Sequence, residues 1–268
     1  MTAITSAILD HHQGAAQMWG SGGKDYNDVS FAISDALAHA AQRLNAKQGQ
    51  SILDVATGTG WTARNVARSG AQVTAIDIAP ELLAAAEQLS ANLPITFRLA
   101  DAERLPFPDA HFDGVISTFG VMFAVDQPQA ARELARVCRP GGRLVLATWA
   151  PDGAVAEFFG VLAKYNDAPP APSSPLAWGK REHVISLLGD AFSLTFESGV
   201  SHAYHDDEDD IWNWYARGFG PLRTLVERLS PERRLDLKRD VDAYHGHYKT
   251  AAGLTVAREY LLTKGVRR

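Results

Sequence analysis

The stretch SILDVATGTGWTARNVARSG (residues 51–70) places a carboxylate and a Gly-x-Gly turn between two apolar runs. SILDV (51–55) is typical of a buried strand, and residues 61–68 are typical of a helix that begins directly after the glycines. A strand–turn–helix unit of this kind lets backbone N–H groups approach a ligand closely, and the helix N-terminus favours negative charge. GTGWTA (58–63) also fits the loose dinucleotide pattern G-x-G-x-x-G/A, which many tight strand–helix turns share.

The chain continues outward from this turn as alternating strands and helices. Buried runs joined by helical crossovers predict an α/β fold with a doubly wound, mostly parallel sheet. Two later β-rich runs bring the expected number of strands to seven. The expected strands are 51–55, 72–77, 95–100, 112–118, 143–149, 193–202 and 254–265, and the expected helices of the alternating region are 61–68, 80–91 and 127–138.

The two flanks of this region differ from it in character. The N-terminal flank is helical with a glycine-rich break, and the segment after the sixth strand is polar, helical and aromatic. A Pro-rich stretch, NDAPPAPSSP (166–175), predicts a loop. We therefore expect three parts: an N-terminal helical lid over 1–45, a core over 46–204 and 251–268, and a helical insertion over 205–250 that caps the active site.

Composition and charge narrow the class of protein. The chain has 268 residues, 46% of them hydrophobic, and a formal net charge of −5, which gives no electrostatic reason to expect nucleic-acid binding. One cysteine, Cys138, excludes an internal disulfide framework. The N-terminus lacks the pattern of a signal peptide, and no apolar run is long enough to span a membrane. We expect a cytoplasmic protein.

Three carboxylates end three successive predicted strands. Asp54 lies four residues before Gly58, and Asp77 and Asp101 follow at the ends of the second and third strands. The carboxyl ends of parallel strands meet at one edge of a sheet, so these side chains should converge on one crevice. A carboxylate at Asp54 would repel a pyrophosphate, whereas a ligand with an ammonium group and a sulfonium would be attracted. Asp77 is placed to accept from a ribose diol, and Asp101 from an adenine amino group.

Four motifs extend this pattern: ILDVATGTG, VTAIDIAPELLAAA, RLADAERLPFPDAHFDGVIS and RELARVCRPGGRLVLATW. Over about 51–150 they resemble the class I S-adenosylmethionine-dependent methyltransferases, most of all the small-molecule branch similar to the ubiquinone and menaquinone biosynthesis enzymes. RPGG and LPFPDAHFDGV are the most specific parts. The first glycine of the family's motif is Ala56 here. The resemblance implies a Rossmann-like methyltransferase sheet whose last strand is antiparallel, with S-adenosylmethionine as cofactor and S-adenosylhomocysteine as product.

The resemblance also implies which residues hold the cofactor. The turn backbone would hold the methionine end beside Asp54, Asp77 would take both ribose hydroxyls, and Ile78 would pack on the adenine. Asp101 and Ala102 would contact the adenine amino edge, and Ser117 would line the space beside the sulfonium. The implied cofactor residues are Tyr26, Asp54, Ala56, Thr57, Gly58, Gly60, Asp77, Ile78, Asp101, Ala102 and Ser117.

Methyl transfer from a sulfonium requires little side-chain chemistry. The electrophile is already activated, so the protein mainly aligns the nucleophile by proximity and orientation and excludes water during an in-line displacement. A general base is needed only when the acceptor must lose a proton. The fourth strand ends in STFGVMF (117–123) and lacks the Asn-Pro-Pro-Tyr type of motif that binds a nucleobase amino group. This disfavours a methyltransferase that acts on the exocyclic amines of nucleic acids. Cys138 is expected in a helix away from the crevice, which disfavours a covalent cysteine mechanism.

The acceptor should be a small molecule bound by aromatic residues of the flanks and strand ends. Ring faces suit an apolar or cationic acceptor. The expected acceptor residues are Trp19, Phe119, Phe123, Trp149, Trp178, Trp212 and Tyr215. The candidate bases are His11, His12, His202, His205, His245 and His247. HDDEDD (205–210) with HGH (245–247) offers metal-ligand types, but an acidic first turn of a helix explains the acids more simply, and we expect no metal site.

Two other functions stay open at this point. One is an NAD-dependent oxidoreductase on a Rossmann-type fold, which would leave RPGG and Asp101 unexplained. The other is a protein that binds the cofactor without catalysis. The sequence does not specify which catalytic side chain acts, the acceptor, the methylated atom or the oligomeric state.

Overall fold

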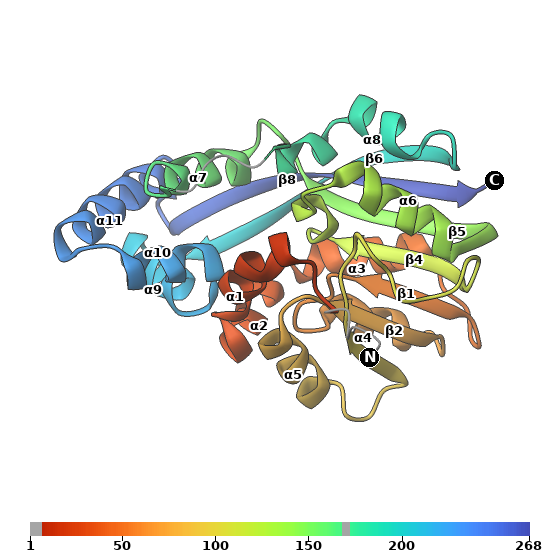
Figure 1. Cartoon of the computed structure of the whole chain (residues 1–268). Coiled ribbons are helices and arrows are strands. Elements are labelled where there is room, and N and C mark those ends of the chain that lie inside the picture. The colour runs from red at the N-terminus through yellow and green to blue at the C-terminus, as the bar shows by residue number, and fades with distance from the viewer. Residues whose placement is uncertain (1–6, 168–171) are drawn as a thin grey trace.

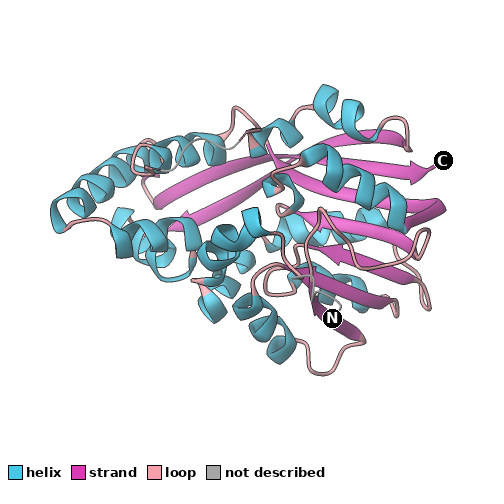
Figure 2. Cartoon of the chain, in the orientation of Figure 1, coloured by secondary structure: helices cyan, strands magenta, loops and turns pink. Residues whose placement is uncertain are grey.

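The structure is a computed structural model that describes residues 7–167 and 172–268. Its centre is one mixed sheet, drawn in magenta in Figure 2. Five parallel strands form the first part of this sheet. The bounds of the first four lie close to those predicted, because buried parallel strands are apolar runs bounded by glycine, proline and polar residues, whereas the fifth begins earlier, at Cys138. These strands are β1 (Ser51–Val55), β2 (Gln72–Asp77), β3 (Ile95–Leu99), β4 (Phe112–Thr118) and β5 (Cys138–Trp149).

The strand order of the sheet is β3-β2-β1-β4-β5-β8-β6. β8 (Gly253–Arg267) pairs antiparallel with β5 and with β6 (Phe192–His205). The predicted seven-stranded, mostly parallel sheet with an antiparallel last strand is therefore confirmed. A two-residue strand, β7 (Lys249–Thr250), adds to β8 and was not expected from the sequence.

The direction in which the chain builds the sheet reverses at β1. β2 and β3 are added on one side of β1, whereas β4 and β5 are added on the other. At such a switch point, the loops after neighbouring strands diverge and leave a crevice at the carboxyl ends of the strands. The three aspartates at the ends of β1, β2 and β3 lie at this edge.

Helices cover both faces of the sheet, as Figure 2 shows. α3 packs against α4 and β5, and α6 packs against α8. α3 belongs to the main core, because its buried face (Ala36, Leu37, Ala40 and Leu44) joins the side chains of the sheet. The helices around the sheet are α3 (Ser34–Leu44), α4 (Trp61–Ala67), α5 (Pro80–Leu89), α6 (Gln127–Val137) and α8 (Arg181–Leu188).

The remaining part of the N-terminal flank lies over the carboxyl edge of the sheet. α1 contacts α5 and α10, while α2 contacts α9, so this flank touches both the core and the insertion. The range 1–45 was expected to be a lid. Its helices α1 and α2 contact α5 and the insertion, whereas α3 belongs to the main core. The elements are η1 (Asp10–His12), α1 (Gln13–Gly20), η2 (Gly23–Asp25) and α2 (Tyr26–Phe31).

β6 and β8 continue beyond the parallel strands and carry a group of helices at the far end of the molecule (Figure 1). This group has its own apolar cluster, which includes Phe158, Phe219, Leu222 and Val241. The acids of 205–210 lie where an acidic first turn was expected, since Asp207 caps α9 by accepting from the N–H of Asp210. The helices are α7 (Ala154–Ala163), α9 (Glu208–Gly218), α10 (Gly220–Arg228) and α11 (Pro231–Gly246).

The RPGG segment (139–142) differs from its prediction. It does not merely separate a helix from a strand, because β5 already begins at Cys138, which pairs with Phe112 before the register shifts. Gly141 has a φ of 74°, and a Cβ on Gly142 would lie 2.7 Å from the carbonyl oxygen of Arg139. RPGG is thus an irregular start of β5, and Cys138 lies in the strand rather than in the preceding helix. Two short 3-10 helices, η3 (Val121–Phe123) and η4 (Pro175–Gly179), complete the described elements.

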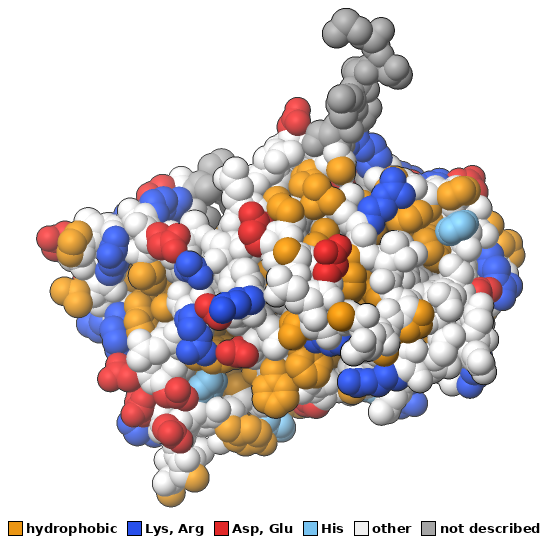
Figure 3. All heavy atoms as spheres, turned by 90° about the horizontal axis from the view of Figure 1, so that it is seen from below, with side chains coloured by type: hydrophobic (Ala, Val, Ile, Leu, Met, Phe, Trp, Pro, Cys, Tyr) orange, Lys and Arg blue, Asp and Glu red, His pale blue; other side chains and the backbone are white. Residues whose placement is uncertain are grey.

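The surface agrees with the modest negative charge of the chain. On the face shown in Figure 3, acidic and basic side chains are interspersed. Within 7–167 and 172–268, no helix has both the length and the apolar character needed to cross a bilayer.

Candidate active site

The glycine turn after β1 bends sharply around a cavity at the switch point. Ala56, Gly58 and Gly60 all have positive φ angles (56°, 57° and 82°). Ala56 therefore takes a left-handed conformation that usually favours glycine, which explains why a glycine stands there in the family's motif. Gly60 lies just outside the cavity, and its missing side chain makes room for Ala86 and Phe97, so it serves helix–sheet packing.

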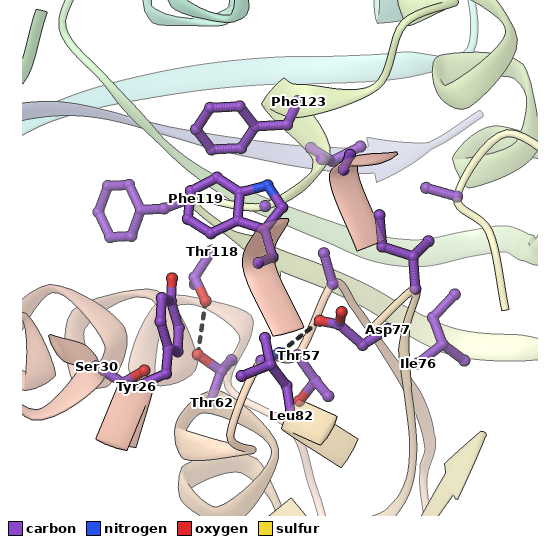
Figure 4. A pocket seen from close by; sticks show the side chains of 18 of the residues that line it. Tyr26, Ser30, Thr57, Thr62, Ile76, Asp77, Leu82, Thr118, Phe119 and Phe123 are labelled. Carbon is purple, nitrogen blue, oxygen red and sulfur yellow. Dashed lines mark hydrogen bonds between the residues drawn. The ribbon is translucent and has the colours of Figure 1, made fainter. Parts of the chain in front are cut away.

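Asp77 fixes this turn from the end of β2. Its Oδ2 accepts from the backbone N–H of Gly58 at 2.8 Å, and its Oδ1 accepts from that of Ala79 at 3.0 Å. Figure 4 shows the Asp77 carboxylate beside the glycine turn, on the wall of the cavity. Burial raises the pKa of Asp77, although its backbone hydrogen bonds oppose that rise. A buried carboxylate held on the wall of a cavity can accept hydrogen bonds from a ligand diol.

Asp54 lies beneath the turn rather than on the cavity wall. Its Oδ2 accepts from the Thr57 hydroxyl at 2.6 Å, while its buried Oδ1 has no hydrogen-bond partner among the described residues. Burial, together with the charge of Asp77, raises the pKa of Asp54 to about 7 against the opposing hydrogen bond from Thr57. A cation bound near the turn would favour the charged form of this carboxyl group.

Tyr26 brings the N-terminal flank onto the glycine turn. A Cβ on Gly58 would lie 3.4 Å from the ring carbon Cε1 of Tyr26, so the ring lies directly against the turn (Figure 4). Burial, and to a lesser extent the charge of Asp77, raises the pKa of the Tyr26 hydroxyl. Tyr26 lines the cavity as a neutral side chain.

Asp101 has partners that the sequence did not reveal. Its Oδ2 accepts from His12 Nδ1 at 2.7 Å and from the N–H of Leu9 at 3.1 Å, and its Oδ1 accepts from the N–H of Glu103. Burial alone would lower the pKa of His12, but its hydrogen bond to Asp101 and the charges of Asp101 and Glu103 raise it. Asp101 thus anchors the segment before α1 while it lines the cavity, and His12 lines the cavity beside it.

The end of β4 forms the opposite wall. Ser117 lies outside the cavity, because its hydroxyl donates to the carbonyl of Val55 and accepts from the N–H of Val121. The next residue, Thr118, lines the cavity and is hydrogen-bonded to Thr62 at 2.7 Å (Figure 4). Phe119 follows with a φ of 58° and stacks on Trp149, their ring centroids 3.8 Å apart.

The first cavity therefore brings together most of the expected cofactor residues. Asp54, Gly60 and Ser117 support its walls from behind. His12, expected only as a candidate base, also lines this cavity. Residues that sequence reasoning missed include Ser30, Trp61, Thr62, Leu82 and Thr118. Of these, Trp61 and Thr62 directly follow the glycine turn, which is a local signal. The expected residues on the wall are Tyr26, Ala56, Thr57, Gly58, Asp77, Ile78, Asp101 and Ala102.

A second cavity adjoins the first and is walled by aromatic rings of the two flanks. Three residues expected to bind the acceptor, Trp19, Phe119 and Phe123, line both cavities. Arg258 and His245 are among the polar residues of the second cavity. His245 Nδ1 lies 2.9 Å from the carbonyl oxygen of Val241, and burial lowers the pKa of His245 to about 4, so its ring is neutral. The expected residues on this wall are Trp19, Phe119, Phe123, Trp149 and Tyr215; those not expected include Phe158, Phe159, Phe219 and Tyr244.

Two expected acceptor residues lie elsewhere. Trp178 is fully buried in the main core, where its carbonyl accepts from the Thr148 hydroxyl. Trp212 packs on the outside of the helical group, with the Lys238 ammonium 5.8 Å from its ring centroid. Neither ring lines a described cavity, because the folding of η4 and α9 turns them away from the crevice.

Comparison with known proteins gives a consistent result. Residues 53–146 match the methyltransferase domain family. The uncharacterized protein Rv1403c of Mycobacterium tuberculosis is 38% identical over 224 residues, which cover 81% of each chain. The demethylmenaquinone methyltransferase of Tropheryma whipplei is 38% identical over 128 residues, 47% of this chain and 53% of that protein. The YcgJ protein of Bacillus subtilis has a similar fold, with a TM-score of 0.59 and 21% identity over 87% of this chain and 98% of that one. The chain belongs to the class I S-adenosylmethionine-dependent methyltransferases.

Proposed function

We propose that this chain transfers the methyl group of S-adenosylmethionine to an apolar small molecule that is neutral or anionic. The observation that carries this proposal is the pair of adjoining cavities, one at the switch point that includes the Asp77 and Asp101 carboxylates and one aromatic between the flanks. The wall that both cavities share consists of Trp19, Tyr26, Ile33, Phe119 and Phe123.

The residues of the first cavity fit the cofactor. Asp77 offers carboxylate oxygens to the ribose hydroxyls, and Ile78 and Leu82 offer apolar contacts to the adenine. The backbone of the glycine turn approaches the methionine end, with the Asp54 carboxyl group beneath it. S-adenosylmethionine, when bound, supplies a methyl group on a sulfonium that needs no further activation.

The polar residues of the second cavity narrow the class of acceptor. The sequence suggested an apolar or a cationic acceptor, because aromatic rings suit both. Arg258 adds a guanidinium to this wall, which makes a cationic acceptor unfavourable. Its charge is held in place by hydrogen bonds to Ala32 and Ser201, so it does not turn away easily. A neutral or acidic acceptor with a large apolar body fits this wall best.

The chain would act mainly by positioning the acceptor and excluding water. We expect α1 and α2, together with the helices over 208–246, to cover the site. His245 is the one of the six candidate histidines that lines the aromatic cavity. Its Nδ1–H donates to Val241, which leaves a neutral Nε2 that can accept a hydrogen bond from an acceptor hydroxyl.

Calorimetric titration of the purified chain with S-adenosylmethionine, S-adenosylhomocysteine and NAD in parallel tests the cofactor. We expect micromolar binding of the two sulfur compounds and no binding of NAD. Binding of NAD alone would overturn the proposal. Binding of the sulfur compounds without methyl transfer to any member of a broad acceptor panel would instead favour a binding protein without catalysis.

Two matched variants separate the cavities. Leu82 lines only the first cavity and Phe159 only the second. Leu82→Ala should weaken cofactor binding, while Phe159→Ala should leave cofactor affinity unchanged and raise the KM of any acceptor found in the panel. A cationic acceptor turned over faster than its neutral analogue would contradict the role given to Arg258.

A further inference from the structure

The segment before α1 places two consecutive histidines on one carboxylate. His11 Nε2 lies 2.8 Å from Glu103 Oε2, and His12 Nε2 lies 3.2 Å from Glu103 Oε1. One potential ligand atom from each of these three residues lies within 4.8 Å of the other two, and this is the one group of its kind among the described residues. Ligand atoms of a tetrahedral zinc site lie about 3.3 Å apart, so the three side chains are close to the spacing that a metal needs.

Asp101 orients one of these histidines as a metal ligand is oriented. His12 Nδ1 lies 2.7 Å from Asp101 Oδ2, so the Nδ1–H donates to the carboxylate. In the neutral ring, His12 Nε2 is an acceptor: the N–H of Val125 lies 3.4 Å from it, a long hydrogen bond, and Glu103 Oε1 lies 3.2 Å away. A cation between Nε2 and Oε1 would relieve the repulsion between these two electron-rich atoms and take the place of the long contact to Val125.

The charge and burial of the cluster favour a metal ion. Asp101 and Glu103 are 0% and 3% exposed, and they accept hydrogen bonds from histidine rings and backbone N–H groups. A divalent ion would neutralise this buried negative charge. The His11 side chain is 46% exposed, which provides a path for the ion and room for a water ligand.

The ligand types indicate which ion would bind. Two imidazoles and one carboxylate suit Zn²⁺ and related first-row ions, whereas Ca²⁺ and Mg²⁺ prefer sites made of oxygen alone. We propose that His11, His12 and Glu103 bind a first-row divalent ion, Zn²⁺ being the best match, with water as a further ligand. The site is distinct from the segments 205–210 and 245–247, whose residues the sequence analysis considered.

The site lies beside the first cavity without being part of the transfer chemistry. His12 and Asp101 also line that cavity. A bound ion would therefore tie the segment before α1 to the loop after β3 at the cavity rim.

Titration of the chelator-treated full chain with Zn²⁺ tests the proposal, and Co²⁺ absorption reports the coordination. The variants are His11→Ala, Glu103→Gln and a control, His202→Ala, which removes an exposed histidine of β6. We expect one equivalent of Zn²⁺ to bind the wild type and the control equally. His11→Ala and Glu103→Gln should bind it roughly tenfold or more weakly.

Three results would overturn the site. One is a wild-type chain that takes up less than one equivalent of Zn²⁺, and another is His11→Ala with wild-type affinity. The third is a His12 ring that still carries two protons in the zinc-loaded protein, as nitrogen NMR would show. None of these readouts depends on methyl transfer, so they stand apart from the tests of the proposed function.

Discussion

The methyl group of Ala56 fills the space that a side chain at Gly120 would need. A Cβ built on Gly120 would lie 2.3 Å from the Cβ of Ala56 and 3.0 Å from its carbonyl oxygen. The loop after β1 and the loop after β4 therefore meet through one methyl group. Because Ala56 is also held at a φ of 56°, the two positions depend on each other.

Gly120→Ala should destabilise the protein by about 1–3 kcal/mol, the range for overpacking a closed site. In the double variant Ala56→Gly/Gly120→Ala, part of this loss should return, because the Cβ–Cβ clash disappears while the close carbonyl oxygen remains. We expect a coupling energy of about 1 kcal/mol, measured by urea denaturation of all four proteins. Gly160→Ala on α7 is the control, since no atom lies within 4 Å of its added Cβ. Additive effects would contradict the contact.

Asp77→Ala should weaken binding of S-adenosylmethionine by about 1.5–3 kcal/mol, the scale for losing charge-assisted hydrogen bonds. The structure adds a second reason for the loss, because the N–H groups of Gly58 and Ala79 lose their acceptor. Calorimetry measures the effect, with Asp152→Ala, an exposed aspartate, as the control. Unchanged affinity of the Asp77 variant would show that the cofactor lies elsewhere.

Asp54 should make the cofactor-free protein less stable as the pH rises. Its pKa is about 7 in the folded state against an ordinary value of 3.8, so between these values the folded protein holds a proton that the unfolded chain has released. Stability therefore falls with rising pH across this window. The stabilisation by Asp54→Asn should be larger at pH 8 than at pH 5 by about 2–3 kcal/mol in denaturant titrations. An equal effect at both pH values would mean that Asp54 is ionised throughout.

Cys138 should be inert in the folded protein. It is 1% exposed, and burial raises the pKa of its thiol to about 11, so little thiolate exists at neutral pH. A chromogenic thiol reagent at pH 8 should titrate one thiol only after denaturation. Cys138→Ala should keep the cofactor affinity of the wild type. Rapid labelling of Cys138 in the folded protein, together with loss of cofactor binding, would contradict its buried position in β5.

The sheet could be predicted because its signals are local. Each strand from 51 to 118 is an apolar run with clear ends, and the helix at Pro80 begins where proline favours a first turn. The position of Asp77 on the cavity wall followed from strand order alone. The RPGG segment was harder to predict, since its glycines indicate the boundary of a strand, whereas the strand already begins at Cys138, whose backbone pairs with Phe112.

The partners of the site residues could not be predicted in the same way. Asp101 and His12 are 89 residues apart, and no periodicity connects them. Trp178 and Trp149 look alike in sequence and both belong to the main core, yet only Trp149 also lines the aromatic cavity. Such differences arise when distant segments pack, and a single sequence carries no local signal for them.

The two cavities differ in how much of the chain builds them. The wall at the switch point comes largely from one continuous stretch, 56–124, whereas the aromatic wall also needs residues from 154–159, 214–219 and 244–258. Changes in those later segments can reshape one cavity while the other keeps its geometry. The preference for an acceptor can thus change among relatives faster than the use of the cofactor. Exchanging residues 208–246 between two relatives is a direct way to transfer that preference.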